Sequence, residues 1–298
     1  MISFQKKKRT VYTNGYDTRE SMNTAAWSLD SKSFLVTGGT KGIGYATAKS
    51  LLSHGAGIVI ICARGDVTDA VESLRKVIPS GSQSQMIYGL SCDISVKGGR
   101  SELVEFVKDK VGGTLDGLVN NVGMNIRKTF TEQTEEEYEQ MMRTNVDSAY
   151  FLCKNLKGML ESASSVHGSA SVVNVASAAG VMSSGTGAVY GMSKAAMIHL
   201  SKILACEWAK LNIRVNAVAP WMTMTPMLQD AVKKNPHQLD KVKEWTPMHR
   251  LSTADDVSGP ILFLLMPASS YITGVCIPID GGLSAQGFDG PCVTPPET

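Results

Sequence analysis

Ser177, Tyr190 and Lys194 are the residues of this chain whose types and spacing could carry out a reaction. A phenol beside a lysine can donate a proton near neutral pH, because a nearby ammonium favours the phenolate and lowers the pKa of tyrosine from its ordinary value of about 10. A serine hydroxyl within reach can hold a substrate oxygen as charge develops on it. Together the three residue types indicate proton transfer at an oxygen atom.

The Tyr-x-x-x-Lys spacing alone is a weak signal, because so short a pattern occurs three times in the sequence. The residue thirteen positions before each tyrosine separates the three copies: Lys32 before Tyr45, Glu137 before Tyr150, and Ser177 before Tyr190. Only the third copy follows a serine, and this serine ends an apolar run typical of a β-strand. We therefore take the third copy and its serine as the candidate catalytic group.

The elements that must position these side chains are short apolar runs that alternate with helical patterns from residue 33 onward. The runs are β-branched or almost continuously apolar, which is typical of strands covered on both faces. The predicted strands are 33–37, 57–62, 86–92, 116–120, 170–176, 213–218 and 275–280. Their alternation with helices predicts the α/β class: a single doubly wound, Rossmann-type domain with a parallel sheet of about seven strands and helices on both faces. Residues 187–194 are predicted to begin a helix, so Tyr190 and Lys194 share one face.

The 298-residue chain contains 43% hydrophobic residues, which is enough for a sizeable core. We expect one folded domain over residues 30–285, because no linker divides this range, and a C-terminal tail over 286–298. Residues 1–29 are polar, contain a basic run at 6–9 and lack a hydrophobic segment. They predict a flexible N-terminal extension without a secretory signal. A transit peptide is the alternative, and the acidic Asp17 and Glu20 disfavour it.

Charge and cysteine content exclude several classes of function. The net charge of +2 gives no electrostatic reason to expect nucleic-acid binding. No apolar run approaches the roughly 18 residues of a membrane span, so no membrane contact is expected. The six cysteines are scattered without metal-binding or redox spacing, which predicts no metal site and a reduced, cytoplasmic location.

A glycine-rich segment follows the first predicted strand and precedes a helical run; it reads Thr37-Gly38-Gly39-Thr40-Lys41-Gly42-Ile43-Gly44. Glycines at such a turn let the backbone approach a ligand closely, and the helix N-terminus offers free N–H groups to a diphosphate. Three residues separate Gly38 from Gly42, so the spacing differs from the G-x-G-x-x-G form. The position between strand and helix nevertheless predicts a dinucleotide site.

The end of the second predicted strand bears on the choice of cofactor. No acidic residue closes this strand, and Arg64 follows it, while Lys41 adds a second cation from the glycine-rich segment. Two cations suit the 2′-phosphate of NADP, whereas NAD needs a carboxylate for its ribose hydroxyl. Asp66 could supply that carboxylate, but it fits better as a residue at the start of the next helix. The sequence therefore favours NADP(H) over NAD(H).

Polar residues follow the next two predicted strands. Asp93 and Ile94 follow the third strand, and Asn121 and Gly123 follow the fourth. Ligands bind at the carboxyl ends of strands in open α/β sheets, so these residues are candidates for cofactor contacts. Asn145 lies in a helical pattern and, taken alone, is a polar residue on a helix face.

In this order and spacing, these residues resemble the short-chain dehydrogenase/reductase family over about residues 30–285. The resemblance rests jointly on the 38–44 segment, the 120–123 run, Asn145, Ser177, Tyr190 and Lys194. Segments 205–220, 233–238, 246–251, 267–274 and 280–282 are similar to plant tropinone reductases and their relatives. The resemblance implies an NADP(H)-dependent oxidoreductase that interconverts a small-molecule ketone and an alcohol.

The resemblance also implies a role for each matching residue. Tyr190 would be the general acid that protonates the carbonyl oxygen, and Lys194 would lower its pKa and bind the nicotinamide ribose. Ser177 would hold the carbonyl oxygen, and Asn145 would support Lys194 through a water molecule. The implied cofactor contacts are Gly38, Thr40, Lys41, Gly42, Ile43 and Gly44 at the phosphates, Arg64 at the 2′-phosphate, Asp93 and Ile94 at adenine, Asn121 and Gly123 at the adenosine-side ribose, and Pro220, Thr223 and Thr225 beside Tyr190 and Lys194.

The chain departs from the family pattern at two positions. Val122 stands where the family has alanine, and Trp221 stands where a glycine follows Pro220. The indole at the rim makes Trp221 a candidate substrate-binding residue besides Ser177 and Tyr190. The implied substrate lid, about residues 221–250, is rich in methionine and tryptophan, which fits a small, largely apolar ketone. A cationic ketone such as tropinone would favour an acidic neighbour, which the sequence does not place.

Two alternatives remain open. A 3-oxoacyl-[acyl-carrier-protein] reductase would need a basic patch for its acidic carrier, for which the candidates are Lys233, Lys234, Lys241 and Lys243. A non-catalytic NADP(H)-sensing protein would be indicated by loss of the tyrosine or the lysine, and both are present. The resemblance further implies a homo-oligomer, a dimer or tetramer. The apolar stripe between Ala195 and Cys206 could pair with a neighbour or pack on the sheet.

Overall fold

A computed structural model describes residues 24–80, 82, 84–225, 228–229, 233 and 236–286. Its sheet has seven parallel strands in the order β3-β2-β1-β4-β5-β6-β7. The strands are β1 (Ser33–Thr37), β2 (Ile58–Ala63), β3 (Met86–Ser91), β4 (Gly117–Asn120), β5 (Ala170–Val175), β6 (Ile213–Pro220) and β7 (Cys276–Ile279). Each agrees with the predicted run to within two residues at either end. The doubly wound parallel sheet predicted from the sequence is confirmed.

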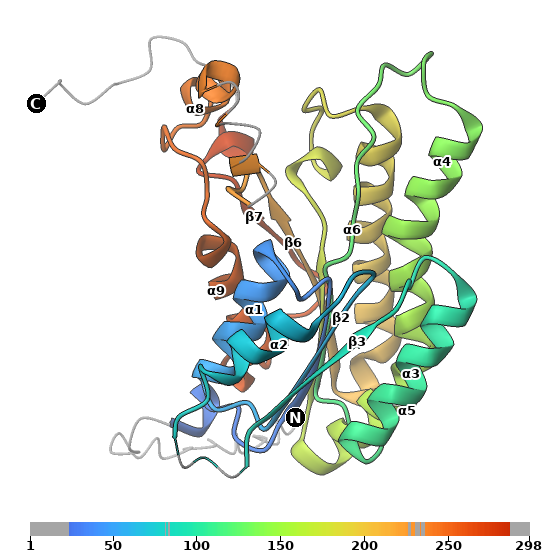
Figure 1. The fold of residues 1–298 in the computed structure, drawn as a ribbon, viewed down its shortest axis with the longest axis vertical. Coiled ribbons are helices and arrows are strands. Elements are labelled where there is room, and N and C mark those ends of the chain that lie inside the picture. The colour runs from blue at the N-terminus through green and yellow to red at the C-terminus, as the bar shows by residue number, and fades with distance from the viewer. Residues whose placement is uncertain are drawn as a thin grey trace, which may run out of the picture.

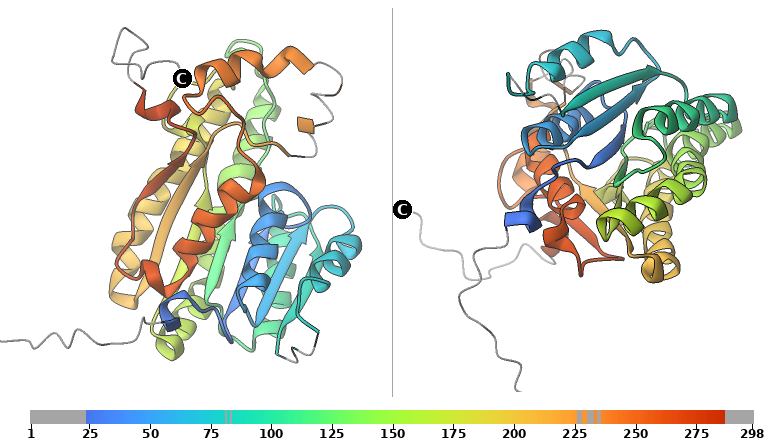
Figure 2. Two further views of the ribbon diagram at one scale, coloured as in Figure 1. Left: turned by 90° about the vertical axis from the view of Figure 1, so that its left-hand side faces the viewer. Right: turned by 90° about the horizontal axis from the view of Figure 1, so that it is seen from below.

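Helices cover both faces of the sheet, as Figures 1 and 2 show. One face carries α1 (Gly42–Ser53), α2 (Thr68–Arg75) and α9 (Ala254–Leu265). The other carries α3 (Lys97–Val111), α5 (Ser148–His167) and α6 (Ala188–Trp208). Two shorter helices, α4 (Glu135–Met142) and α8 (Asp240–Trp245), lie toward the upper end of Figure 1.

Side chains alternate between two separate cores along each strand. Phe34 and Val36 pack with α1 and α9, whereas Leu35 between them packs with α3 and α5. All three side chains are fully buried. Because both faces of the sheet are covered, the strands need apolar residues at successive positions rather than at every second one. This requirement explains why their apolar runs are almost continuous.

The folded body begins earlier than residue 30, which differs from the prediction of a flexible extension over 1–29. Residues Thr24–Trp27 form a 3₁₀ turn, and the Trp27 ring stacks on Phe263 with centroids 6.1 Å apart. Leu29 is fully buried in the core next to α1 and α9. Apolar burial therefore fixes this segment. Residues 1–23 and 287–298, which the remaining tail predictions concern, lie outside the described residues.

None of the helices in the described ranges combines the length and the apolar character that a membrane span requires.

Candidate active site

A cavity of about 660 Å³ opens where β4, β5 and β6 end, and its size suits a small ligand. The loop after β4, the turn after β5, the first turns of α6 and the segment after β6 form its walls. Of the residues predicted for the site, those that line it are Ile43, Asn121, Gly123, Ser177, Tyr190, Lys194, Pro220, Trp221, Thr223 and Thr225. The structure thus brings Ser177, Tyr190 and Lys194 to one cavity, whereas Asn145 does not line it.

Ser177, Tyr190 and Lys194 meet because β5 and α6 present them from two sides. Ser177 follows β5 and caps a short 3₁₀ turn, where its hydroxyl accepts a 3.2 Å hydrogen bond from the backbone N–H of Ala179. Helix α6 begins after Gly187, so Tyr190 and Lys194 project from its first two turns. The Lys194 ammonium lies 5.7 Å from the centre of the Tyr190 ring. This arrangement can hold a carbonyl oxygen beside a phenolic proton.

The protonation behaviour of the pair differs from the expectation that Lys194 lowers the pKa of Tyr190. Burial raises the pKa of Tyr190 above its ordinary value, against the lowering effects of a hydrogen bond with Ser177 and the charge of Arg127. Burial also lowers the pKa of Lys194 to about 8. The Lys194 ammonium donates a 2.9 Å hydrogen bond to the Val175 carbonyl. Tyr190 therefore holds its proton at neutral pH in the free protein.

Asn145 supports the site from a π-helical turn, Arg143–Asp147, between α4 and α5. Its amide oxygen accepts from the Met124 N–H at 2.8 Å, and its amide nitrogen donates to the Met124 carbonyl at 2.9 Å and to Ser193 at 3.0 Å. A Cβ atom at Gly123 would lie 3.0 Å from the Lys194 ammonium and 3.5 Å from the Asn145 oxygen. Gly123 thus lets Asn145 and Lys194 approach each other. Single π-helical turns are frequent at functional sites.

The glycine-rich segment is packed against the end of β4. Asn121 donates to the carbonyls of Thr37 and Gly38 at 2.8 and 3.3 Å, so its side chain holds the segment in place. Gly38 has a φ of +65°, which favours glycine. A Cβ atom at Gly44 would lie 2.6 Å from the Asn121 amide nitrogen. The backbone conformation at Gly38 and the local packing at Gly44 therefore require glycine at these positions.

The N-terminus of α1 and two cations form the adenosine side of the predicted site. Lys41 precedes α1 without a side-chain capping bond, so the N–H groups of Gly42 and its successors remain open to an anion. Lys41 and Arg64 are both exposed. The Asp66 carboxylate is engaged by the N–H and hydroxyl of Thr68 at 2.9 and 2.7 Å, as its predicted place before α2 requires. These residues fit a dinucleotide that carries an additional phosphate.

Asp93 and Ile94 follow β3 on the same side. Asp93 accepts a 2.9 Å hydrogen bond from the N–H of Ser95. Burial opposes ionisation of Asp93, but the hydrogen bonds from Ser95 and the charge of Arg64 together lower its pKa. Ile94 is buried in the core against α3 and α5. Asp93 therefore balances part of the charge of Arg64.

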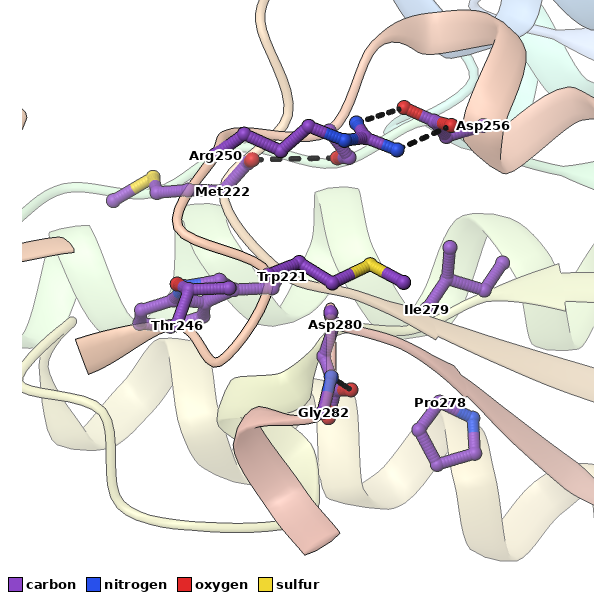
Figure 3. Close-up of a pocket in the computed structure, with 12 residues that line it drawn as sticks. Trp221, Met222, Thr246, Arg250, Asp256, Pro278, Ile279, Asp280 and Gly282 are labelled. Carbon is purple, nitrogen blue, oxygen red and sulfur yellow. Dashed lines mark hydrogen bonds and ion pairs between the residues drawn. The ribbon is translucent and has the colours of Figure 1, made fainter. Parts of the chain in front are cut away.

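The segment after β6 closes the other side of the cavity. The Trp221 indole N–H donates to the Thr246 hydroxyl at 3.2 Å, and Figure 3 shows the two side chains in a neighbouring pocket that Trp221 also lines. Farther along the chain, Arg250 forms two hydrogen bonds to Asp256, of 2.7 and 3.1 Å. Thr225 reaches the glycine-rich segment, since a Cβ atom at Gly42 would lie 3.3 Å from its methyl group. Residues after β6 are thus held by contacts of Trp221 and Thr225 near the start of the segment and of Arg250 near its end.

Comparison with known proteins decides the family. The family model described as enoyl-(acyl carrier protein) reductase matches residues 38–284. A tropinone reductase homolog of Arabidopsis thaliana is 43% identical over 262 residues, which cover 88% of this chain and 96% of that protein. The chain belongs to the short-chain dehydrogenase/reductase family. The resemblance inferred from the sequence is confirmed.

Two further comparisons place this short-chain dehydrogenase/reductase among its relatives. A tropinone reductase homolog of A. thaliana that is named chloroplastic is 41% identical over 263 residues, 88% of this chain and 78% of that protein. The solved Pseudomonas aeruginosa RhlG/NADP active-site complex has a TM-score of 0.78 and 31% identity, over 87% of this chain and 98% of that chain. The chain therefore shares its fold with a protein whose NADP complex has been solved.

Sequence reasoning missed several residues that line the cavity of this short-chain dehydrogenase/reductase. Met124, Asn125 and Arg127 come from the loop after β4, and Thr186 comes from the segment before α6. None of them stands in a motif. The available signal was positional, because any side chain that closely follows a β4-like strand lies at the ligand-binding edge of such a sheet.

Proposed function

We propose that this short-chain dehydrogenase/reductase reduces a small, largely apolar ketone to an alcohol, and catalyses the reverse reaction, with NADPH as the hydride donor. The observation that carries this proposal is the meeting of Ser177, Tyr190 and Lys194 in one cavity of about 660 Å³. Trp221, Met222 and Leu228 provide apolar wall for the body of the ketone. Bound NADPH would supply the hydride, and the chain would supply position and proton transfer.

Each catalytic side chain has a distinct task in this proposal. Tyr190 delivers its proton to the carbonyl oxygen, and its raised pKa keeps the phenol protonated at neutral pH. The Ser177 hydroxyl holds the same oxygen as negative charge develops on it. Lys194 is charged below its pKa of about 8 and stabilises charge that develops on the Tyr190 oxygen. Asn145 acts as a positioning residue through Met124 and the loop after β4.

The charges around the adenosine side support NADP(H) over NAD(H). Lys41 and Arg64 are exposed cations, and the nearby Asp66 is occupied by Thr68. A 2′-phosphate gains from both cations, whereas a ribose hydroxyl lacks a free carboxylate from this turn. The NADP complex of the RhlG protein is in line with this preference.

The carrier-protein alternative is less well supported by the surface near the cavity. Lys241 and Lys243 lie on α8, where Lys243 is 3.8 Å from Asp240 and Glu244 follows it. Lys233 has an interaction partner, and Lys234 lies outside the described residues. Mixed charges on α8 do not form the basic patch that an acidic carrier requires. The sensing alternative is disfavoured by the intact Tyr190 and Lys194.

We also propose the wider organisation that the resemblance implies. Residues 221–250 act as a substrate lid on a domain that extends to about residue 285. On α6, the side chains of Ala195, His199, Ile203 and Cys206 are exposed, so they do not pack on the sheet. This exposed face supports a homo-oligomer, either dimer or tetramer, which light scattering would measure. A cytoplasmic location is our proposal, with a plastid as the alternative raised by the chloroplastic relative.

The deciding experiment is the oxidation of NADPH, and separately of NADH, by the purified protein across a panel of ketones. The panel contains an apolar monoterpene ketone, a steroid ketone, a bicyclic aminoketone and an acetoacetyl carrier thioester. Faster turnover of the small apolar ketone with NADPH supports the proposal. Turnover of the thioester alone supports the carrier alternative, and NADPH binding without any turnover supports the sensing alternative.

A further inference from the structure

We propose that Arg127 selects the substrate by binding a carboxylate on it, so that the ketone reduced here is an oxo acid with an apolar body. This inference rests on the proposed function and names the substrate class for the same site. It depends on the position of Arg127, on the way its loop is held, and on the charge balance of the cavity.

Arg127 lies at the junction of two hollows. It lines the cavity that contains Ser177 and Tyr190, and it also lines an adjoining groove of about 950 Å³ between residues 127–132 and 179–195. Its side chain is exposed, so a ligand can reach the guanidinium from the opening. It is also near enough to Tyr190 for its charge to act on the phenol. A small substrate could therefore contact Arg127 and Tyr190 together.

The loop on both sides of Arg127 is held by contacts with three other segments: the π-helical turn, α4 and the segment before α6. The Asn145 side chain forms hydrogen bonds with both the N–H and the carbonyl of Met124. The Ile126 N–H donates to the Met141 sulfur at 3.4 Å. The Asn125 amide donates to the Thr186 carbonyl at 3.0 Å. On the far side, the Lys128 ammonium is 2.6 Å from Glu137 of α4. A loop fixed in this way loses little further freedom when its arginine binds a ligand.

The charges that line the cavity are unbalanced. Among the described residues that line it there are two cations, Arg127 and Lys194, and no aspartate or glutamate. Lys194 is buried and donates to the Val175 carbonyl. Arg127, unlike its neighbour Lys128, has no hydrogen-bond or ion-pair partner in the described part of the chain. Its charge is therefore available to a ligand.

A carboxylate matches this site better than a neutral or cationic group. The planar guanidinium presents paired donors that fit the two oxygens of a carboxylate. A protonated aminoketone would meet a like charge at Arg127, which disfavours it. Because a hydrogen bond to a charged group is stronger than one to a neutral group, we expect a carboxylate to be preferred over an uncharged group of similar shape by roughly 10-fold. Trp221, Met222 and Leu228 remain available for the apolar body.

The test compares an apolar oxo acid with its methyl ester, which differ in charge but little in shape. The wild-type enzyme with NADPH should show a kcat/KM at least tenfold higher for the acid. Arg127→Gln should remove most of this preference, mainly through KM, and Arg127→Lys should retain part of it. Arg75→Gln is the matched control, because Arg75 is exposed at the end of α2 and does not line the cavity. It should keep the preference of the wild type.

A binding measurement separates this inference from the proposed function. Calorimetric titration of the oxo acid into the protein with NADP⁺ should give a Kd that Arg127→Gln weakens by the same factor and Arg75→Gln leaves unchanged. Turnover of acid and ester at equal kcat/KM would overturn the inference and leave the reductase proposal intact. Absence of all turnover, with binding that still depends on Arg127, would overturn the reductase proposal and support the anion site. Equal binding by wild type and Arg127→Gln would overturn the anion site in either case.

Discussion

The Lys194 ammonium points past the Tyr190 ring, 5.7 Å from its centre, and bonds the carbonyl oxygen of Val175 at 2.9 Å. The contact ties the second turn of α6 to the end of β5, and so fixes Tyr190 relative to Ser177. The same burial that makes the contact precise lowers the pKa of Lys194 to about 8. Lys194 thus links α6 to β5 by a hydrogen bond and also places a charge beside the Tyr190 phenol.

Lys194 should make the stability of the protein rise with pH. Its pKa is about 8 in the folded protein and 10.5 ordinarily, so between these values the unfolded chain binds more protons. The contribution of Lys194 to stability therefore increases from about pH 8 to pH 10.5, by on the order of 3 kcal/mol in total. Urea unfolding at several pH values should show this added upward slope in wild type and not in Lys194→Met. A Lys202→Met control, on the exposed side of α6, should keep it. Identical slopes in all three proteins would contradict the lowered pKa.

Tyr190→Phe should lower kcat by about 10²- to 10⁴-fold, because it removes the proton donor and keeps the ring. The Kd for NADPH, measured by fluorescence titration, should change little. Tyr150→Phe provides the matched control, since Tyr150 has the same Tyr-x-x-x-Lys spacing but is 48% exposed on α5. Undiminished turnover in Tyr190→Phe would mean that another group supplies the proton.

Arg64→Asp should shift the preference from NADPH toward NADH by about 10-fold or more, because it replaces a phosphate partner by a carboxylate. The ratio of kcat/KM values for the two cofactors measures this shift. Asp66→Asn should leave the ratio unchanged, since the Asp66 carboxylate is engaged by Thr68. If Arg64→Asp left the ratio of the wild type intact, Arg64 would not contact the 2′-phosphate.

Gly44→Ala should weaken cofactor binding. The added methyl group would lie 2.6 Å from the Asn121 amide nitrogen, so the glycine-rich segment must shift. Overpacking of this kind costs about 1–3 kcal/mol, and we expect the Kd for NADPH to rise by roughly 5- to 100-fold. Gly65→Ala is the control, because a Cβ atom there meets nothing within 4 Å. Equal Kd values for NADPH in Gly44→Ala and Gly65→Ala would show that the glycine-rich segment accommodates the added methyl group without loss of cofactor affinity.

Leu29→Ala should destabilise the protein by about 2–5 kcal/mol, the usual cost of removing a fully buried leucine side chain. Chemical denaturation measures the change. Val166→Ala, at a position 67% exposed on α5, should change stability by less than about 0.5 kcal/mol. A negligible effect of Leu29→Ala would mean that residues before 30 do not belong to the core.

The seven strands could be predicted from the sequence because their signal is local. A strand covered on both faces needs successive apolar residues, and such a run is visible without knowledge of its neighbours. The catalytic set was equally accessible, since Ser177, Tyr190 and Lys194 come from one strand end and one helix start in close succession. Asp66 was correctly placed at the start of α2 for the same reason: its partner is two residues away.

Contacts between distant segments were decided only by the tertiary structure. The π-helical turn at Asn145 is held by Met124 and Ser193, which lie 21 and 48 residues away. The burial of Leu29 and the stacking of Trp27 on Phe263 depend on helices that follow much later in the chain. Arg127 stands in no motif, and only the fold shows that it lines the same cavity as Tyr190, where the described lining residues include no carboxylate. The sequence by itself determined the elements and the candidate reacting groups, because these follow from neighbouring residues. The protonation of those groups and the position of Arg127 at the cavity arise from burial and long-range packing, which no short stretch of sequence contains.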